Sequence, residues 1–486
     1  MMKINNALLS ALTLGILLCG CNFKPVTPQK QTGFKADYAS TNVSTQWWKS
    51  FNDPQLNALI QSALEQNSDL QTALNNVEYA RVNLGLNKLE YLPNVNLSGS
   101  AVRQNNFGNR PDRNSHGAYQ IGAVLSYEID LWGRVRNSVD SARSRFNATK
   151  YDYETAKNTI TSTVATTYFT LLALKQQEQI LKDSLKSYQD TQNYRKKQLD
   201  AGAVSEIVFY QAKAAVQSAE ASLISVQNQL SAAQTSLNIL TGKSYDEILR
   251  GTAQIAAKMP SAPQIPSGIP SDVILHRPDV ASSLENLRSS NFLVGVAKAG
   301  YFPTFSLTGS AGYASGEFDR LFTASASTWS IGGSLVGPLL DFGRQKRRVE
   351  LANLEQNASF IAYDKALKTA FGDVRDALVG VQNAKLRQAS LADLVASQSK
   401  IYSNASSRYQ TGYSDHLEFL DSQRNLLSAQ LNKVQADLDV LNATVNAYKA
   451  LGGGFSIEDS EIKALIGAEQ DVQPDMSAFP KDRIFN

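Results

Sequence analysis

Two long stretches of this sequence contain almost nothing that ends a helix. Residues 134–201 contain no Gly and no Pro, and residues 344–411 contain no Pro and only Gly372 and Gly380. At a rise of ~1.5 Å per residue, each stretch predicts a helix of about 100 Å. Globular domains rarely need such a helix, so we expect the fold to span an unusually long distance.

The spacing of apolar residues within the first stretch supports one continuous helix. Apolar side chains recur at steps of three, four or seven, at Val135, Val139, Ala142, Phe146, Tyr153, Ala156, Ile160, Val164, Leu171 and Leu174. This spacing places them on one helical face and is close to the heptad pattern of a coiled coil. Taken alone, the stretch is equally typical of a simple coiled-coil rod.

The N-terminus is typical of a secretory signal. A basic start is followed by an apolar run over residues 7–18, which is too short to span a membrane. Residues 18–21, Leu-Cys-Gly-Cys, resemble a lipobox, which predicts removal of residues 1–20 and a covalent lipid on Cys21. The alternative is an ordinary signal peptide with an incidental cysteine. By resemblance to lipoprotein sorting in Gram-negative bacteria, Asn22 in place of Asp favours the outer membrane.

Composition and charge narrow the function classes. The net charge is only +3 on 486 residues, which gives no reason to expect nucleic acid as a partner. Cys19 and Cys21 are the only cysteines, so we expect no disulfide in the mature chain. No later run of 18 apolar residues exists, and a membrane span would therefore have to be a β-barrel.

The sequence contains two copies of one unit, displaced by 210 residues. Six landmarks recur at this offset: residues 67–70 and 277–280, 91–93 and 301–303, 97–101 and 307–311, 133–134 and 343–344, Gly202 and Gly412, and 240–242 and 450–452. A constant offset across so many landmarks is typical of tandem structural repeats.

The repeat divides the chain into six segments. These are a signal peptide (1–20), a lipidated tether and a following segment (21–66), repeat 1 (67–242), a connector (243–275), repeat 2 (276–452) and a C-terminal tail (453–486). Each repeat is expected to hold a helix, a β-hairpin, the long helix and a shorter return helix, over 69–92, 95–129, 134–201 and 203–241 and at the same positions plus 210. The fold class is thus mainly α with a small β part.

The strand segments alternate apolar with polar or small residues, as transmembrane barrel strands do. The same alternation also fits a half-buried strand in a soluble sheet. Four strands in one chain cannot close a membrane barrel, which needs about eight or more. Closure therefore requires several chains. Three would give a barrel of twelve strands continued by a long helical barrel, and the arithmetic also permits a dimer with eight.

An aromatic cluster precedes the first repeat. Trp47, Trp48 and Phe51 could anchor the chain at a membrane interface or fill a core, and we favour the core. Asp53 followed by Pro54 predicts the start of a helix that runs to about Asn67.

Several motifs resemble the TolC-type outer membrane efflux channels, in their lipoprotein (NodT/OprM-like) branch. They are Trp47-Trp48-x-x-Phe51-x-Asp53-Pro54-x-Leu56, Tyr127–Arg134 as Tyr-Glu-Ile-Asp-Leu-Trp-Gly-Arg, Arg277-Pro278-Asp279-Val280, Tyr301-Phe302-Pro303 and Leu420-Asp421-Ser422-Gln423-Arg424. Residues 127–133, 291–297 and 452–455 most resemble CmeC-type multidrug efflux channels. The resemblance implies a homotrimer with four transmembrane strands per chain, docked to a periplasmic adaptor and an inner-membrane pump of the resistance-nodulation-division (RND) class. It also implies that the connector and the tail form an equatorial belt.

The resemblance further implies a periplasmic gate at the tip of the second helical hairpin. The acidic ring of the family falls on Glu418 and Asp421, its tip tyrosine falls on Tyr409, and Asp415 lies one helical turn from Glu418. Where the family has a tip arginine, this chain has Ser414. Three copies of each carboxylate around an axis would attract cations. The alternative is that these acids only form a solvated helix start.

The turns of both hairpins resemble the adaptor-docking tips of the family, at Gly202, Ala203 and Val204 and at Gly412, Tyr413 and Ser414; the alternative is simple turn chemistry. No catalytic motif and no cysteine-based metal site occur, and no cofactor is expected beyond the lipid on Cys21. We interpret His116, His276 and His416 as loop or surface residues.

We therefore predict an outer membrane exit duct for drugs, dyes and detergents rather than an enzyme. Two further classes are a duct for type I protein secretion or metal-ion efflux, and a coiled-coil lipoprotein without a pore. Scarce Met and His argue weakly against a duct specialised for copper.

Overall fold

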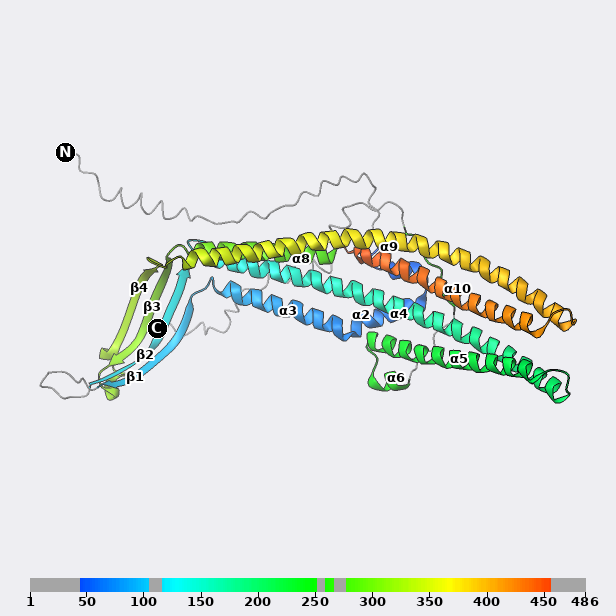
Figure 1. Ribbon diagram of the computed structural model, residues 1–486. Helices are drawn as coiled ribbons and strands as arrows, with labels where there is room; N and C mark the ends of the chain where they lie inside the picture. Colours follow the sequence, from blue (N-terminus) through cyan, green and yellow to red (C-terminus); the bar gives the residue numbers. More distant parts are fainter. Residues whose placement is uncertain (1–43, 105–115, 251–257, 266–276, 456–486) are drawn as a thin grey trace, which may run out of the picture.

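The computed structural model describes residues 44–104, 116–250, 258–265 and 277–455. Within these ranges the protein is an elongated rod of helices with a four-stranded sheet at one end (Figure 1). No helix in the described part of the chain is long and apolar enough to cross a membrane. The predictions for Cys21, for most of the first hairpin loop and for nearly all of the tail fall outside the described residues.

The two repeats have the same elements, and their helix bounds differ by the offset of 210. Repeat 1 holds α3 (Ser68–Leu89), β1 (Asn94–Gln104), β2 (His116–Ile129), α4 (Arg134–Asp200) and α5 (Glu206–Leu240). Repeat 2 holds α8 (Pro278–Ala299), β3 (Thr304–Ser315), β4 (Ser327–Val336), α9 (Arg344–Gln410) and α10 (His416–Ala450). The tandem repeat and the two long helices are therefore confirmed.

Glycines at the turns explain where the long helices begin and end. Gly133 and Gly343 precede α4 and α9 with φ of 78° and 84°, in the left-handed region that favours glycine. The helix before each hairpin ends three residues earlier than we predicted, at Leu89 and Ala299. Residues 90–92 form a tighter turn instead, in which each amide donates a hydrogen bond to the carbonyl three residues back. The α-helix does not continue to Leu92, because the residue before a proline disfavours α-helical backbone angles.

The sheet is antiparallel with the order β1-β2-β3-β4, so the hairpins of the two repeats pair through β2 and β3. The register of this central pairing places Ala123 opposite Ala311 and Leu125 opposite Gly309. The outer strands β1 and β4 each have one edge without a strand partner among the described residues, and β4 is exposed along its whole length.

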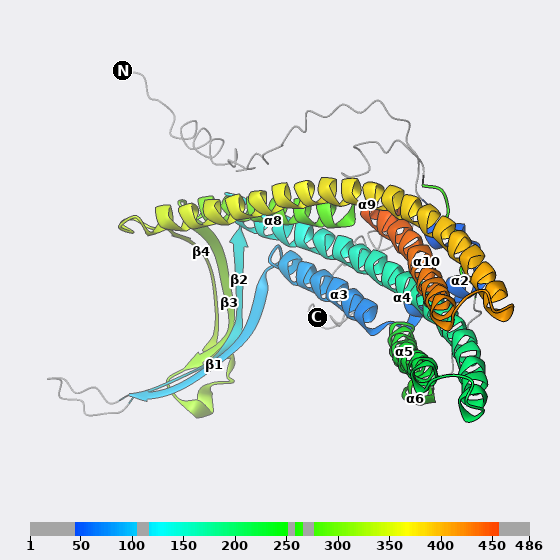
Figure 2. The same cartoon turned by 45° about the vertical axis from the view of Figure 1, so that its right-hand side comes forward.

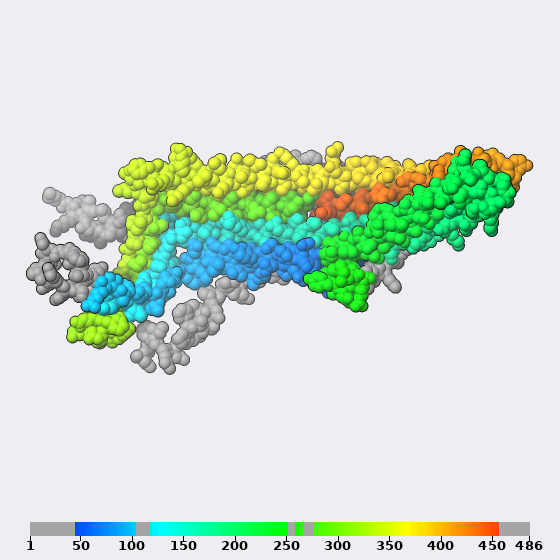
Figure 3. Space-filling view, turned by 60° about the horizontal axis from the view of Figure 1, so that its bottom comes forward, coloured from blue at the N-terminus to red at the C-terminus, as the bar shows by residue number. Residues whose placement is uncertain are grey.

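The helices form two layers along the rod. Helices α3 and α5 lie in line along α4, and α8 and α10 lie in line along α9 (Figures 1 and 2). Figure 3 shows α3 and α5 following one another along the side of the molecule. The layers join because α4 also contacts α8 and α10.

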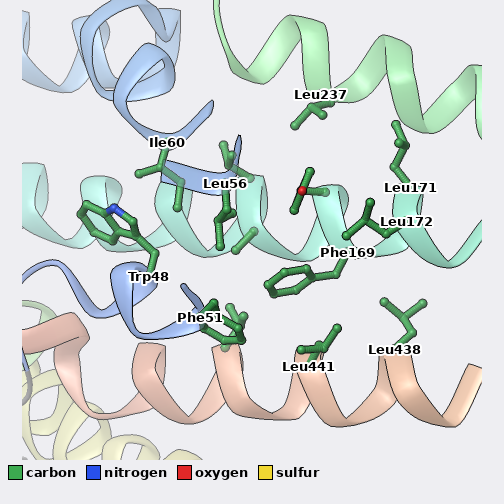
Figure 4. Close-up of a cluster of buried hydrophobic side chains, with 14 of the residues drawn as sticks. Trp48, Phe51, Leu56, Ile60, Phe169, Leu171, Leu172, Leu237, Leu438 and Leu441 are labelled. Atoms are coloured by element: carbon green, nitrogen blue, oxygen red, sulfur yellow. The ribbon is translucent and has the colours of Figure 1, made fainter. Parts of the chain in front are cut away.

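The main apolar core lies midway along the rod, where the segment before repeat 1 packs against α4, α5 and α10 (Figure 4). A short 3-10 helix, η1 (Trp47–Phe51), and α2 (Pro54–Gln66) supply Trp47, Trp48, Phe51, Leu56 and Ile60, all buried. The aromatic cluster is thus a core plug, as favoured. Asp53 begins α2 by accepting the amide of Gln55 at 2.9 Å and the hydroxyl of Tyr168 at 2.8 Å.

The connector and the second hairpin loop contain short elements that we did not predict. Helix α6 (Tyr245–Arg250) follows α5, and two 3-10 turns, η2 (Phe318–Arg320) and η3 (Ala324–Ala326), lie between β3 and β4. The short 3-10 turn η4 (Gly452–Gly454) follows α10.

Candidate functional site at the second hairpin tip

The tips of both helical hairpins lie at the end of the rod opposite the sheet (Figure 1). At the second tip, Gly412 has φ of 78°, and the Tyr413 amide donates to the Arg408 carbonyl at 2.9 Å. This six-to-one bond is the usual way in which glycine closes a helix C-terminus. It reverses the chain within a few residues and brings the end of α9 beside the start of α10.

Glu418 is the centre of the polar contacts at this tip. The guanidinium of Arg408 donates to Glu418 Oε1 at 3.2 Å, and the hydroxyl of Ser414 donates to Glu418 Oε2 at 2.6 Å. Asp415 caps α10, accepting the Glu418 amide at 2.8 Å. Ser414 stands where the resembling family has arginine, and the cation comes instead from Arg408 on the same hairpin. Sequence reasoning missed Arg408 because only the turn geometry brings it to Glu418.

The other predicted gate residues do not join this polar group. Asp421 accepts the side-chain amide of Asn425 at 3.2 Å on the exposed face of α10. Tyr409 packs inward and stacks on Phe419, with ring centroids 4.9 Å apart and planes 13° apart. The structure thus brings Ser414, Asp415 and Glu418 together, while Asp421 and Tyr409 lie on different faces of the hairpin.

His416 is buried, so our interpretation of it as a loop or surface residue was wrong. It is the first residue of α10, and its ring lies 6.0 Å from that of Tyr409. Burial lowers its pKa to about 4, with a further lowering by nearby Arg195. Periodicity gave no sign of this, because the burial depends on α4 of repeat 1 lying against the tip of repeat 2.

Arg195 is the other residue that sequence reasoning missed. Its guanidinium lies over the ring of Tyr409, 4.8 Å from the centroid, so that it connects the two hairpins. A signal was present in the repeat: the position 210 residues later is Ala405, which is buried in α9. A long cationic side chain in one repeat, at a position that holds a small buried residue in the other, indicates a site where the two repeats differ in structure.

The first tip has the same turn and a different polar content. Gly202 has φ of 68°, and the Ala203 amide donates to the Gln198 carbonyl at 2.8 Å. Ser205 begins α5 without a side-chain cap. Glu418 and Asp421 are replaced by Val208 and Gln211. The predicted docking residues therefore form two turns, Gly202, Ala203 and Val204 in the first and Gly412, Tyr413 and Ser414 in the second. The first turn is followed by Glu206, and the second by Asp415 and Glu418, which are hydrogen-bonded to each other.

In the described residues, no group of three or more His, Cys, Asp or Glu side chains could hold a metal ion. The described part of the tip is built from side-chain charges, hydroxyls and aromatic rings.

Comparison with known proteins shows to which family this architecture belongs. The family model described as "Outer membrane efflux protein" matches residues 59–243 and 269–453, once for each repeat. The chain belongs to the outer membrane efflux protein family. Members of this family are passive outer membrane channels that extend into the periplasm, so the predictions of an outer membrane location and of conduction without catalysis are confirmed. The lipid anchor on Cys21 stays a prediction.

Three similar proteins illustrate the range of the family. The chain is 31% identical over 413 residues to the solvent efflux pump outer membrane protein SrpC of Pseudomonas putida, covering 84% of this chain and 87% of that protein. It is 28% identical over 425 residues to the cation efflux system protein CusC of Escherichia coli O6:H1, covering 86% and 90%. The crystal structure of the Campylobacter jejuni CmeC outer membrane channel superposes with a TM-score of 0.85 at 30% identity, covering 94% and 100%. The predicted resemblance to TolC-type channels is confirmed.

Proposed function

We propose that this protein is the exit duct of a tripartite efflux pump, assembled as a homotrimer and conducting drugs, dyes and detergents to the exterior. The observation that supports this most is the rod itself. At one end lies a sheet whose two outer edges have no strand partner in the described part of the chain, and at the other end lie two hairpin tips. An open strand edge is not tolerated in lipid, because its backbone groups would lack hydrogen bonds. Three copies would close twelve strands into a barrel.

The hairpin tips suit the periplasmic end of such a duct. We propose that Gly202, Ala203, Val204, Gly412, Tyr413 and Ser414 dock a periplasmic adaptor, which links the duct to an inner-membrane RND pump. Tyr413 leaves most of its ring exposed at the tip, as a docking surface requires. Tyr409, Asp415, Glu418 and Asp421 would form the gate, with Glu418 held by Arg408 and Ser414 in the closed form. We also propose that a lipid on Cys21 anchors the chain to the outer membrane.

Similarity to a solvent efflux protein and to the CmeC channel supports the proposal of organic substrates. Similarity to a cation efflux protein supports metal-ion export as the second candidate, ahead of type I protein secretion. In a tripartite pump the inner-membrane component selects the substrate and the duct conducts what it receives, so the duct sequence constrains the substrate only weakly.

The deciding experiment measures accumulation and growth in cells with and without the chain. Loss of the chain should raise ethidium and bile-salt accumulation, and the full-length chain supplied in trans should restore efflux. Growth in copper and silver salts and secretion of a reporter protein should stay unchanged. Equal dye accumulation, with the chain still present in outer membranes, would overturn the multidrug proposal, and metal sensitivity would favour the second candidate.

A further inference from the structure

A buried polar cluster joins the first hairpin to the tip of the second. Arg195 of α4 lies over Tyr409 of α9, and Tyr409 in turn contacts Phe419 and His416 of α10. The exposed fraction is only 5% for Arg195 and 7% for His416. Three helices from two repeats therefore meet at one aromatic ring, close to the turn that we propose as the gate.

The hydrogen bonds of this cluster are incomplete. Arg195 donates to Gln198 at 2.5 Å through one terminal nitrogen, while its Nε has no hydrogen-bond partner among the described residues. Within the same part of the chain, neither ring nitrogen of His416 has a hydrogen-bond partner. A buried polar atom without a partner costs roughly as much as the hydrogen bonds it has lost. The cluster itself is therefore held by ring contacts and by the cation over Tyr409. Just beyond it, Leu420 packs in an apolar cluster with Tyr188, and Gln423 donates to Ser187 at 2.9 Å, so the body of the two hairpins stays joined when the tip separates.

The charges around His416 are mostly positive. Arg195 faces it from α4, and Arg424 faces it from α10. Asp415 is the one acid that favours the charged imidazole, and its carboxylate already accepts the Glu418 amide. Tyr409 contributes a ring from α9 and no charge at neutral pH. A proton on His416 would therefore add a positive charge beside the buried Arg195, with the exposed Arg424 as a second cation nearby.

We propose that Arg195 and neutral His416 form a proton-sensitive latch, which holds the second hairpin tip against the first and releases it when the periplasm is acidified. This inference rests on the proposed function, because it takes the second tip as the gate. Arg195 acts as a positioning residue: it places the Tyr409 ring and, through it, the start of α10.

The sign of the pH effect follows from linkage. The pKa of His416 is about 4 in the latched tip and returns to its ordinary value of 6.5 once the tip is released and hydrated. Between these values the released tip binds more protons, so latching is weakened as the pH falls below 6.5 and the loss is complete near 4. Over this window each pH unit shifts the equilibrium up to about tenfold per chain.

The test is the conductance of purified full-length trimers in planar bilayers, recorded between pH 7.5 and 5. Wild type should open increasingly as the pH falls. His416→Leu, which keeps an apolar group in the buried position, should lose most of that increase. His416→Asn serves as a second variant without a titrating group. Arg195→Gln should already be open at pH 7.5 and respond less to acid, and Arg195→Lys should restore closure in part.

A double variant, Glu418→Ala with Asp421→Ala, separates this proposal from the gate assignment. It should raise conductance at every pH and keep the His416-dependent increase. If the double variant conducts like wild type, the tip is not the gate and the proposed function of these residues fails. If it opens the channel while His416→Leu keeps the full acid response, the gate stands and the latch is overturned.

Discussion

Helices α4 and α9 are the same element in two copies, with equal lengths and bounds displaced by 210 residues, yet their surroundings differ. Helix α4 contacts α2, α3, α5, α8 and α10, and apolar side chains along much of its length are buried. The main contacts of α9 are with α8 and α10, and large apolar side chains such as Leu351 and Ile361 stay exposed. The scarcity of Gly and Pro predicts both helices, so the difference lies in which neighbours the single chain provides.

This difference shows that α9 lacks, within a single chain, neighbours that α4 has. Helix α4 of repeat 1 packs on α8 of repeat 2, where Ser141 meets Ser289 at 2.8 Å. The matching contact from repeat 2 to a following repeat 1 would pair α9 with α3 of another copy. The two serines map by the offset onto Leu351 and Tyr79, which are 61% and 75% exposed. In the proposed homotrimer, the contacts within one chain therefore predict those between copies.

The largest expected effect concerns the open strands. Within the chain, Ala123 of β2 lies opposite Ala311 of β3. The equivalent positions in the other repeat are Gly333 of β4 and Ala101 of β1, so we expect these two residues to lie opposite each other where β4 of one copy meets β1 of the next. Residues directly opposite in antiparallel strands have Cβ atoms about 4.5–5.5 Å apart, close enough for oxidation to join two cysteines. Gly333→Cys with Ala101→Cys should give covalent dimers and trimers on non-reducing gels of outer membranes.

Two variants control this register. Ala123→Cys with Ala311→Cys should cross-link within one chain and leave monomers. Gly333→Cys with Val102→Cys shifts the register by one residue, which turns the second side chain to the opposite face, and should not cross-link. Monomers alone from the first pair would refute the contact between copies, and efficient cross-linking of the shifted pair would refute the register.

The second prediction tests the helices. Leu351→Asp should lower the temperature at which trimers dissociate, because it removes about 1.5–3 kcal/mol of apolar burial from each contact between copies and places a charge there. Circular dichroism should show unchanged helix content, since Leu351 is exposed in the single chain. Ser141→Asp, the same change at the matched position of α4, should instead disturb folding of the chain itself. Equal trimer stability for Leu351→Asp and wild type would rule out α3 as the partner of α9.

The helices and strands could be predicted from local sequence, whereas the contacts between side chains at the site could not. The absence of Gly and Pro over residues 134–201, with αL glycines at the turns, was enough to place α4 and its repeat within one or two residues. The environment of His416 could not be predicted in this way, because it depends on Arg195, more than 200 residues away. Glu418 was placed at the tip correctly, whereas its partner Arg408 needed the turn itself to be known.

A third prediction concerns the plug, which in the described part of the chain packs on the long helix of repeat 1 but not on that of repeat 2. Tyr168 is buried and donates to Asp53, while its counterpart Leu378 in α9 is partly exposed. Tyr168→Phe should destabilise the plug by about 1.5–3 kcal/mol, the usual value for a hydrogen bond to a charged group. Leu378→Ala should have a smaller effect. Protease cleavage within residues 47–66 during heating measures both, and equal susceptibility of the two variants would contradict the asymmetry.

The same tyrosine gives the plug a dependence on alkaline pH. Burial, together with the hydrogen bond and charge of Asp53, raises the pKa of Tyr168 above its ordinary value of 10.0. The folded state therefore holds this proton more tightly, and its stabilisation is complete below pH 10 and declines above it. The decline should be shallower in Tyr168→Phe, which has no hydroxyl to ionise.

The smallest expected effect separates the two tips. Asp415 caps α10 through the Glu418 amide, whereas Ser205 makes no side-chain cap on α5. Asp415→Ala should lower the local stability of the second tip by about 0.5–2 kcal/mol, and Ser205→Ala should leave the first tip almost unchanged. Hydrogen exchange of residues 206–210 and 416–420 at pH 7.5 reports both. If Asp415→Ala leaves exchange unchanged, Arg408 and Ser414 alone hold the second tip, and the difference between the tips lies in how Glu418 is bound rather than in how the helix starts.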